Sequence, residues 1–481
     1  MIQSFPCHPV PPDAGPVPSV PAARIGPGSP TAEHKARAGV GRTPTMTPNV
    51  NPQGGLPPGI SAEANVLPYL NARTGWAPSV VVSPGGGPGG DGGDFGSGTP
   101  GTVTQGINEA LQSVASTGGV VVVQRGSYAV KATITIPTNV TLVLQGATLT
   151  AAVSLPNMVV FKPNATVIGF GTINGNRLAG TVVFMATGGR VVGSGGVLTV
   201  ANNAFGQPYF AGITLSNCTD VEVSHVTLID TALFVNGVSR GAFTDIRVQI
   251  TTNLGANPQV TRPVYIIANA APSSYLKFAR VHVEGGGVQN VSLFVFNGGQ
   301  HAPIQNCSVT DCSFDHALDG SVADGLDVVG CDSVTVTGCF GSRVCDGISV
   351  CGSTNVTLTG NVMHFCSAAG ISLADGSILA TTKYITVTGN ICVSNGTKPT
   401  CPPPGKAGIT SLSKPGSVTS DLLIVGNICG DQGKGTQQYG VYLDGTPTNV
   451  VIAYNNLHGN GTAGYAYAGT NATVSSSNNL G

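Results

Sequence analysis

From about residue 100 onward, apolar residues tend to occupy every second position in short segments separated by turn residues. Such alternation predicts β-strands, because successive side chains of a strand point to opposite faces. An exception lies between Ile107 and Val114, where the apolar spacing is that of an amphipathic helix that ends before Gly118. The pattern therefore predicts one short helix followed by an all-β domain.

A repeat of strand and turn fills the second half of the chain. One strand ends at asparagine or cysteine in six segments, at residues 334–339, 356–361, 385–390, 422–427, 450–455 and 473–478. Another strand keeps the same phase, at residues 325–328, 347–350, 370–373, 408–411, 440–443 and 464–467. Loops of different length separate these strands. Such a repeat is typical of a solenoid of stacked coils, and it predicts a parallel β-helix.

Alternation within the second strand assigns its residues to two faces. Leu326 and Val328 point inward, toward a core that continues from coil to coil, whereas Asp327 points outward. The asparagines that end the first strand predict a ladder of stacked amides along one turn, formed by Asn361, Asn390, Asn427, Asn455 and Asn478.

The N-terminal region has a different composition. Residues 1–100 hold 19 of the 33 prolines and a glycine-rich run at 85–93. Such a segment buries too little apolar surface to offset the entropy lost on ordering. The sequence therefore predicts a disordered arm over residues 1–100 and a β-helix domain over residues 101–481.

Charge is scarce and balanced in this chain. Charged residues make up 9% of it, against roughly 25% in an average soluble protein, with 21 basic and 22 acidic residues. Without a basic patch, nucleic acid is not an expected partner. No apolar stretch predicts membrane insertion, and prolines occupy the first thirty residues where a signal peptide needs an apolar core. The localisation stays open, with an extracellular, virion or cell-surface site favoured.

Acidic residues concentrate in one region of this weakly charged chain. Seven of the 22 lie within residues 311–346. Asp324 and Asp346 each precede the glycine that opens the same strand on consecutive coils, so they are expected side by side over one groove. Two such carboxyls suit glycoside hydrolysis, in which one holds a proton and the other activates water. Two alternatives to catalysis are open. The carboxylates bind Ca²⁺, although no cofactor is required, or they are acidic residues of turns without a chemical role.

Three further residues are candidates for substrate binding. Asp327 and Tyr442 face outward on the same strand column, and His316 lies in the acidic region. Among the cysteines, Cys312 with Cys339 and Cys392 with Cys429 fall on consecutive coils. Neighbouring coils are within disulfide reach, so disulfides and stacked reduced thiols are both compatible with the sequence.

Residues 118–128 resemble the opening motif of the pectin lyase-like superfamily, and the preceding helix matches the one that caps its N-terminal end. The resemblance implies a right-handed, single-stranded parallel β-helix. Asp324 and Asp346 also match two aspartates of the polygalacturonase family. The family's proton donor falls on Cys345, its histidine on Ala368 or Ala369, and its cationic clamp near Thr410, so the motif set is incomplete.

These observations predict a carbohydrate-directed β-helix protein, a hydrolase or lyase acting on acidic polysaccharides through Asp324 and Asp346. The alternative is a non-catalytic surface or virion scaffold of the tailspike type, which the incomplete motifs favour. No segment after the last coil is expected to cover its strands, so the sequence also predicts a homo-oligomer or a partner contact at the C-terminal end of the β-helix.

Overall fold

The computed structural model describes residues 79–87, 93–204, 211–251, 262–269, 271–285, 292–298, 302–317, 323–374, 381–412, 418–469 and 474–481. Contacts divide the chain into two units, and the smaller one, residues 6–63, lies outside these ranges. The predicted disorder of residues 1–78 therefore falls outside the described residues.

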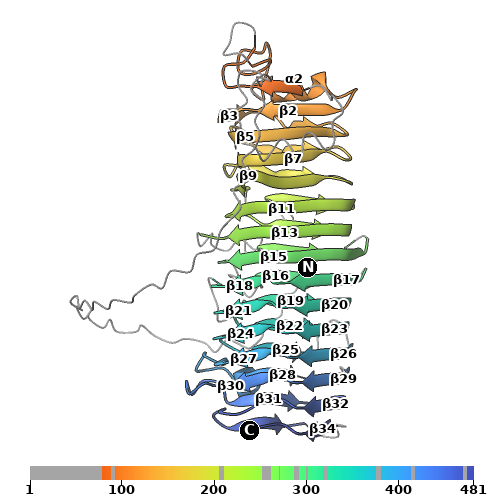
Figure 1. Cartoon of the computed structure of the whole chain (residues 1–481), viewed down its shortest axis with the longest axis vertical. Helices are drawn as coiled ribbons and strands as arrows, with labels where there is room; N and C mark the ends of the chain where they lie inside the picture. Colours follow the sequence, from red (N-terminus) through yellow and green to blue (C-terminus); the bar gives the residue numbers. More distant parts are fainter. Residues whose placement is uncertain are drawn as a thin grey trace, which may run out of the picture. The chain divides into compact units, whose positions relative to one another are not determined.

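The described chain winds through stacked coils that form two parallel sheets (Figure 1). The larger, sheet A, consists of β1 (Ser79–Val82), β2 (Gly119–Val123), β3 (Gly126–Val130), β5 (Val140–Ala151), β7 (Thr166–Asn174), β9 (Arg190–Ala201), β11 (Thr219–Ile229), β13 (Ser239–Gln249), β15 (Ser273–Glu284), β17 (Ile304–Thr310), β18 (Ser313–Asp315), β20 (Cys331–Thr337), β21 (Phe340–Ser342), β23 (Thr354–Thr359), β24 (Val362–His364), β26 (Thr381–Thr388), β27 (Ile391–Val393), β29 (Val418–Val425), β30 (Ile428–Gly430), β32 (Thr448–Ala453) and β34 (Val474–Ser477). The smaller, sheet B, consists of β4 (Ile134–Ile136), β6 (Leu155–Phe161), β8 (Ala179–Met185), β10 (Ile213–Ser216), β12 (Leu233–Asn236), β14 (Val264–Ile267), β16 (Phe294–Asn297), β19 (Leu326–Val329), β22 (Ile348–Cys351), β25 (Ile371–Ala374), β28 (Ala407–Leu412), β31 (Tyr439–Asp444) and β33 (Ala463–Tyr467). A 3-10 helix, η1 (Pro403–Lys406), precedes β28. The all-β prediction is confirmed.

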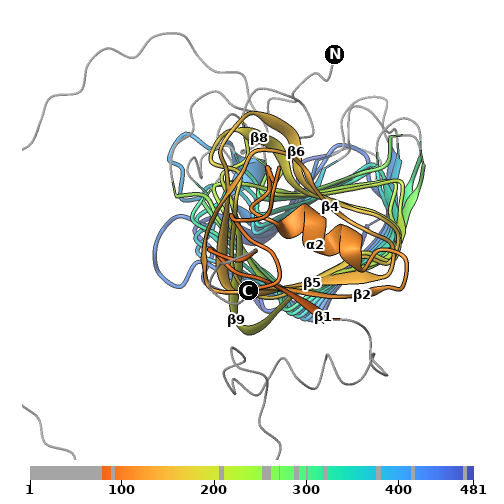
Figure 2. The same ribbon diagram turned by 90° about the horizontal axis from the view of Figure 1, so that it is seen from above.

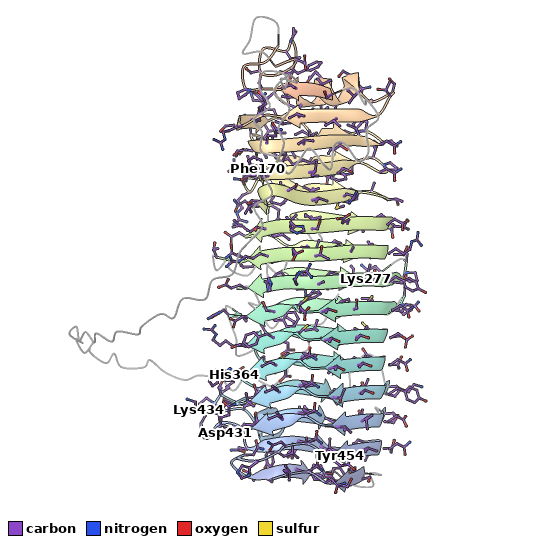
Figure 3. The ribbon with its side chains drawn as sticks, viewed as in Figure 1. Phe170, Lys277, His364, Asp431, Lys434 and Tyr454 are labelled. Carbon is purple, nitrogen blue, oxygen red and sulfur yellow. The ribbon has the colours of Figure 1, made fainter. Side chains whose placement is uncertain are left out.

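Strand register keeps equivalent residues in columns. In sheet B, Leu326 pairs with Ile348 and Val328 with Val350, and all four are fully buried. Side chains fill the interior of the coils and also line their outer surface (Figure 3). The predicted inward and outward faces are therefore confirmed for this strand.

Helix α2 (Ile107–Ser113) closes the N-terminal opening of the coils (Figure 2). Its residues Ile107, Ala110 and Leu111 are fully buried, as the sequence pattern predicts. The β-helix begins earlier than the predicted boundary at residue 101, because β1 pairs in register with β2 from Ser79 to Val82. Among the described residues, no helix is both long and apolar enough to cross a membrane.

The asparagine ladder is present, with one correction. Asn361, Asn390, Asn427 and Asn455 are buried, and the side-chain oxygen of each next member accepts the N–H groups of the one before. The last member is Asn479 rather than Asn478, because Val450 pairs with Val474. That register places Asn478 at the left-handed bend, with a φ of 53°.

Candidate functional site

The candidate site lies at the corner where the chain enters sheet B. Leu326 of β19 pairs with Ile348 of β22, so Asp324 and Asp346, two residues earlier in each case, occupy the same level on consecutive coils. Gly325 and Gly347 follow them, and a Cβ on Gly347 would lie 2.5 Å from both the Gly370 carbonyl oxygen and Met363 Sδ. The absence of a side chain lets neighbouring coils approach here.

The structure brings Asp324, Asp327 and Asp346 together. The backbone N–H of Asp346 donates to Asp324 Oδ1 at 2.8 Å, and the side chains of Asp324 and Asp327 hydrogen-bond to each other. Burial raises the pKa of Asp324 well above its usual range, and the charges of Asp327 and Asp346 raise it further. Asp324 thus holds a proton that it donates to Asp327. We call these three residues the carboxyl cluster.

Asp346 titrates near neutrality. Burial, more than any other cause, raises the pKa of Asp346 to about 7, and the nearby charge of Asp327 adds to this effect. The Ala369 N–H donates to Asp346 Oδ1 at 2.8 Å, and the Ser372 hydroxyl donates to the same carboxylate, which partly opposes the rise. Asp346 and Asp327 are partly exposed, whereas Asp324 is 7% exposed.

Of the two hydrogen-bonded carboxyl groups, Asp327 has the lower pKa and Asp324 the higher one. Burial raises its pKa, but the Ser292 hydroxyl donates to its Oδ2 at 2.5 Å, and the Asp324 proton and the charge of Arg262 also stabilise its ionised form. Ser292 and Arg262 were missed by sequence analysis. They occupy the level of Asp324 on the two preceding coils, but loops of variable length separate them from the recognised repeat.

A buried apolar cluster lies beside Asp346 on the C-terminal side. Cys345, Ala368 and Cys401 form it, each less than a tenth exposed. Burial and the Asp346 charge raise the pKa of Cys401 to about 11. The positions at which the polygalacturonase resemblance places a proton donor and a histidine are thus occupied by a buried thiol and alanine.

Among the described residues, neither His316 nor Tyr442 hydrogen-bonds to the carboxyl cluster. His316 Nδ1 lies 2.9 Å from Asp315 Oδ2 and 2.8 Å from Arg343 Nη2, in an exposed group at a left-handed bend next to sheet A. Tyr442 shares the outward column of Asp327, but four coils farther along, about 19 Å at the usual strand spacing. Its ring contacts Tyr439 edge to face at 4.9 Å. Their role in substrate binding stays a prediction.

Within the described ranges, no three His, Cys, Asp or Glu side chains are placed to hold a metal ion together. In the carboxyl cluster, the side chains of Asp324 and Asp327 hydrogen-bond to each other, which requires a proton on one of the two carboxyl groups. Even where charged groups gather at the edge of sheet A, as at His364, Asp431 and Lys434 (Figure 3), Asp431 accepts hydrogen bonds from its own loop.

The predicted cysteine pairs are stacked. Cys392 pairs directly with Cys429 in the strand register, and Cys312 and Cys339 lie on consecutive coils with their thiols in hydrogen-bond contact. All four are buried free thiols in the structure.

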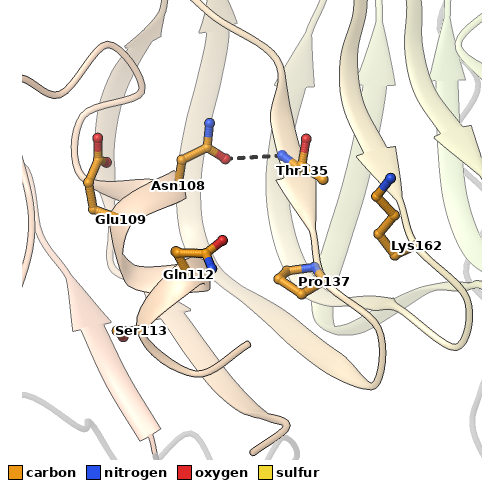
Figure 4. Close-up of a pocket in the computed structure, with 7 residues that line it drawn as sticks. All are labelled: Asn108, Glu109, Gln112, Ser113, Thr135, Pro137 and Lys162. Carbon is orange, nitrogen blue, oxygen red and sulfur yellow. Dashed lines mark hydrogen bonds between the residues drawn. The ribbon is translucent and has the colours of Figure 1, made fainter. Parts of the chain in front are cut away.

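A cavity of about 750 Å³ lies at the other end of the solenoid, between α2 and β4 (Figure 4). Two of its polar side chains, Asn108 and Glu109, hydrogen-bond to neighbouring parts of the chain. Asn108 bridges to β4 through the Thr133 carbonyl oxygen and the Thr135 N–H, and Glu109 accepts from the Thr102 hydroxyl. The cavity is therefore a structural junction between the helix and the first coil.

Comparisons with known proteins agree on the architecture. A family model for a right-handed β-helix region matches residues 289–416, and no curated protein matches the chain. Similar solved structures include the Dettilon tailspike protein, with 16% identity, a TM-score of 0.50 and coverage of 76% of this chain and 68% of that one. Another is the catalytic domain of a GH87 α-1,3-glucanase solved with tetrasaccharides, with 14% identity, a TM-score of 0.49 and coverage of 78% and 67%. A third is the A-module of the Azotobacter vinelandii mannuronan C-5 epimerase AlgE6, with 15% identity, a TM-score of 0.46 and coverage of 77% and 94%.

Identities this low speak for the fold and not for an activity. The parallel stacking of sheets A and B, the helix over the first coil and the matched β-helix region agree with each other. The chain has the right-handed parallel β-helix fold.

Proposed function

We propose that this protein acts on polysaccharides and that the carboxyl cluster hydrolyses a glycosidic bond. The observation that carries the proposal is the convergence of Asp324, Asp327 and Asp346 at one partly exposed corner, with their pKa values raised. Glycoside hydrolysis requires one protonated and one ionised carboxyl group near the scissile bond at working pH.

The exposures suggest how the roles divide. Asp346 has a pKa of about 7 and is partly exposed, so near neutral pH it can donate a proton to the leaving-group oxygen. Asp327, ionised and facing outward, can activate a water molecule. Asp324 lies behind both and holds a proton against Asp327, which makes it a positioning residue in this scheme. An acidic polysaccharide remains the proposed substrate class.

The test is an assay of new reducing ends on pectic, alginate and neutral polysaccharides, combined with ultraviolet absorbance to detect the unsaturated sugar of a lyase. Asp346→Asn and Asp327→Asn should each lower hydrolysis about 10²- to 10⁴-fold, the usual contribution of a general acid or base. Asp421→Asn is the matched control, because Asp421 lies on sheet A and hydrogen-bonds to Ser420 and Asn449. New reducing ends that appear together with a rise in ultraviolet absorbance would replace hydrolysis by β-elimination, because elimination also frees a reducing end but leaves an unsaturated sugar on the other fragment.

A second function has a specific observation in its favour. Cys345 and Ala368 are buried where the resemblance expects catalytic groups, which fits a non-catalytic surface or virion scaffold that binds glycans at the same corner. Absence of turnover on every polysaccharide, with the wild type and both variants equally folded, would support this function and contradict the hydrolase.

A further inference from the structure

Arg262 lies on the same face as the carboxyl cluster. In the register of β14, β16, β19 and β22, residues Arg262, Ser292, Asp324 and Asp346 occupy one level on four consecutive coils. At the usual strand spacing of about 4.8 Å, Arg262 is therefore about 10 Å from Asp324 toward the N-terminal end. Tyr265 lies in the same outward-facing column of sheet B as Asp327, two coils before it.

The guanidinium of Arg262 is held in place, and one of its donors has no partner among the described residues. Its Cζ lies 4.5 Å from the centre of the Tyr265 ring, which is 9% exposed and so forms a fixed platform. Tyr265 is itself anchored, since its hydroxyl oxygen accepts from Asn297 Nδ2 at 3.5 Å and its ring packs on Phe234 at 5.8 Å. Arg262 Nε is buried and has no hydrogen-bond partner within the part of the chain that the structure describes. A buried donor without an acceptor is unfavourable, so a ligand oxygen that accepts its hydrogen bond gains affinity.

We infer that Arg262, held on Tyr265, is an anion-binding subsite for the carboxylate of a uronic acid residue of the substrate. A planar guanidinium matches a carboxylate through two parallel hydrogen bonds. A sugar residue of an extended polysaccharide advances by a length comparable to the spacing of the coils. A glycan can therefore lie along sheet B with one glycosidic bond at Asp327 and Asp346. The carboxylate of the sugar two residues farther along the glycan then lies at Arg262. The inference rests on the proposed function for its substrate class, but binding tests it without turnover.

The experiment measures calorimetric binding of tetragalacturonate and tetramannuronate, each as the acid and as the uncharged methyl ester, to the full chain. Wild type should bind at least one acid more tightly than its ester. Arg262→Gln should weaken binding of that acid about 10- to 100-fold, the range for a charge-assisted hydrogen bond, and leave the ester almost unchanged. Arg262→Lys keeps the charge but loses the planar fork, so its affinity should fall between the two.

Arg247→Gln serves as the matched control, because Arg247 is an exposed arginine on sheet A whose partner is Glu284. Equal circular dichroism and thermal midpoints show that all variants are folded. The inference is overturned if Arg262→Gln binds the acid as the wild type does, or if the wild type prefers neither acid to its ester. Acid binding that depends on Arg262 without any hydrolysis would support the subsite and remove only the proposed hydrolase activity.

Discussion

The raised pKa of Asp346 predicts how protein stability depends on pH. The folded state binds this proton more tightly than the unfolded state, where the pKa is about 3.9, because burial and Asp327 disfavour the charge. The stabilising contribution is therefore complete below about pH 4 and is lost as pH rises toward 7. Three pKa units at 1.36 kcal/mol each set a ceiling of about 4 kcal/mol.

Asp346→Asn removes this titration. The free energy of unfolding of the variant, measured by urea denaturation between about pH 4 and pH 8, should fall less steeply with pH than that of the wild type. Asp421→Asn should keep the wild-type slope in the same range, because the pKa of Asp421 is lowered by the hydroxyl of Ser420 and by Asn449, which moves its titration below this window. A slope unchanged by Asp346→Asn would contradict the shifted pKa.

Single residues also show what the sequence could predict about the site. Asp324 and Asp346 precede glycines in a recognisable repeat, so their proximity followed from counting. The proton shared between Asp324 and Asp327 could not be predicted in that way, because strand alternation alone places Asp327 on the outer face and says nothing of its burial. The position of Arg262 near the site could not be predicted for another reason. The chain segments between Arg262 and Asp324 have irregular lengths, so the sequence repeat does not align the two residues.

At the scale of elements, the asparagine ladder predicts a large local contribution to stability. Asn390 Nδ2 donates to the Leu358 carbonyl oxygen and to Asn427 Oδ1, and its own Oδ1 accepts from Asn361. Asn390→Ala leaves several buried backbone groups without partners, at about 1–3 kcal/mol for each, so a loss of about 3–5 kcal/mol is expected. Thr335→Ala, an exposed change on β20, should cost less than about 1 kcal/mol. Equal denaturation midpoints for the two variants would refute the structural role of the ladder.

The elements of the C-terminal half were predictable and those of the N-terminal half were less so, for a physical reason. The bends that follow β20, β23, β26 and β29 each use a glycine with positive φ, such as Gly338 or Gly360, followed by a ladder residue, and this leaves a visible sequence pattern. In β5, β7 and β9, the register instead shifts at bulges near Gly146 and Gly169. Longer strands with bulges satisfy the same stacking without repeating the motif.

At the scale of the whole molecule, the two ends of the solenoid differ. Helix α2 buries the first coil, and Val121 and Leu142 beneath it are fully buried. In the last coil, β33 pairs with β31 and β34 with β32, each on one side only within the described residues. Tyr465 and Tyr467 pack on the core there but stay partly exposed. Unpaired strand edges attract further strands unless they are covered.

A homo-oligomer or a partner contact at this end therefore stays a prediction, and a pair of facing chains is its simplest form. Facing copies bury the same surface on both sides, which closes the assembly as a dimer. Light scattering after size exclusion should give a mass near twice 48.2 kDa at high protein concentration. Tyr467→Asp places a charge in the contact and should shift the mass toward the monomer, whereas Tyr384→Asp, at an exposed tyrosine on sheet A, should not. A monomer at every concentration would contradict this contact and leave the tyrosines as a partial cover for the core.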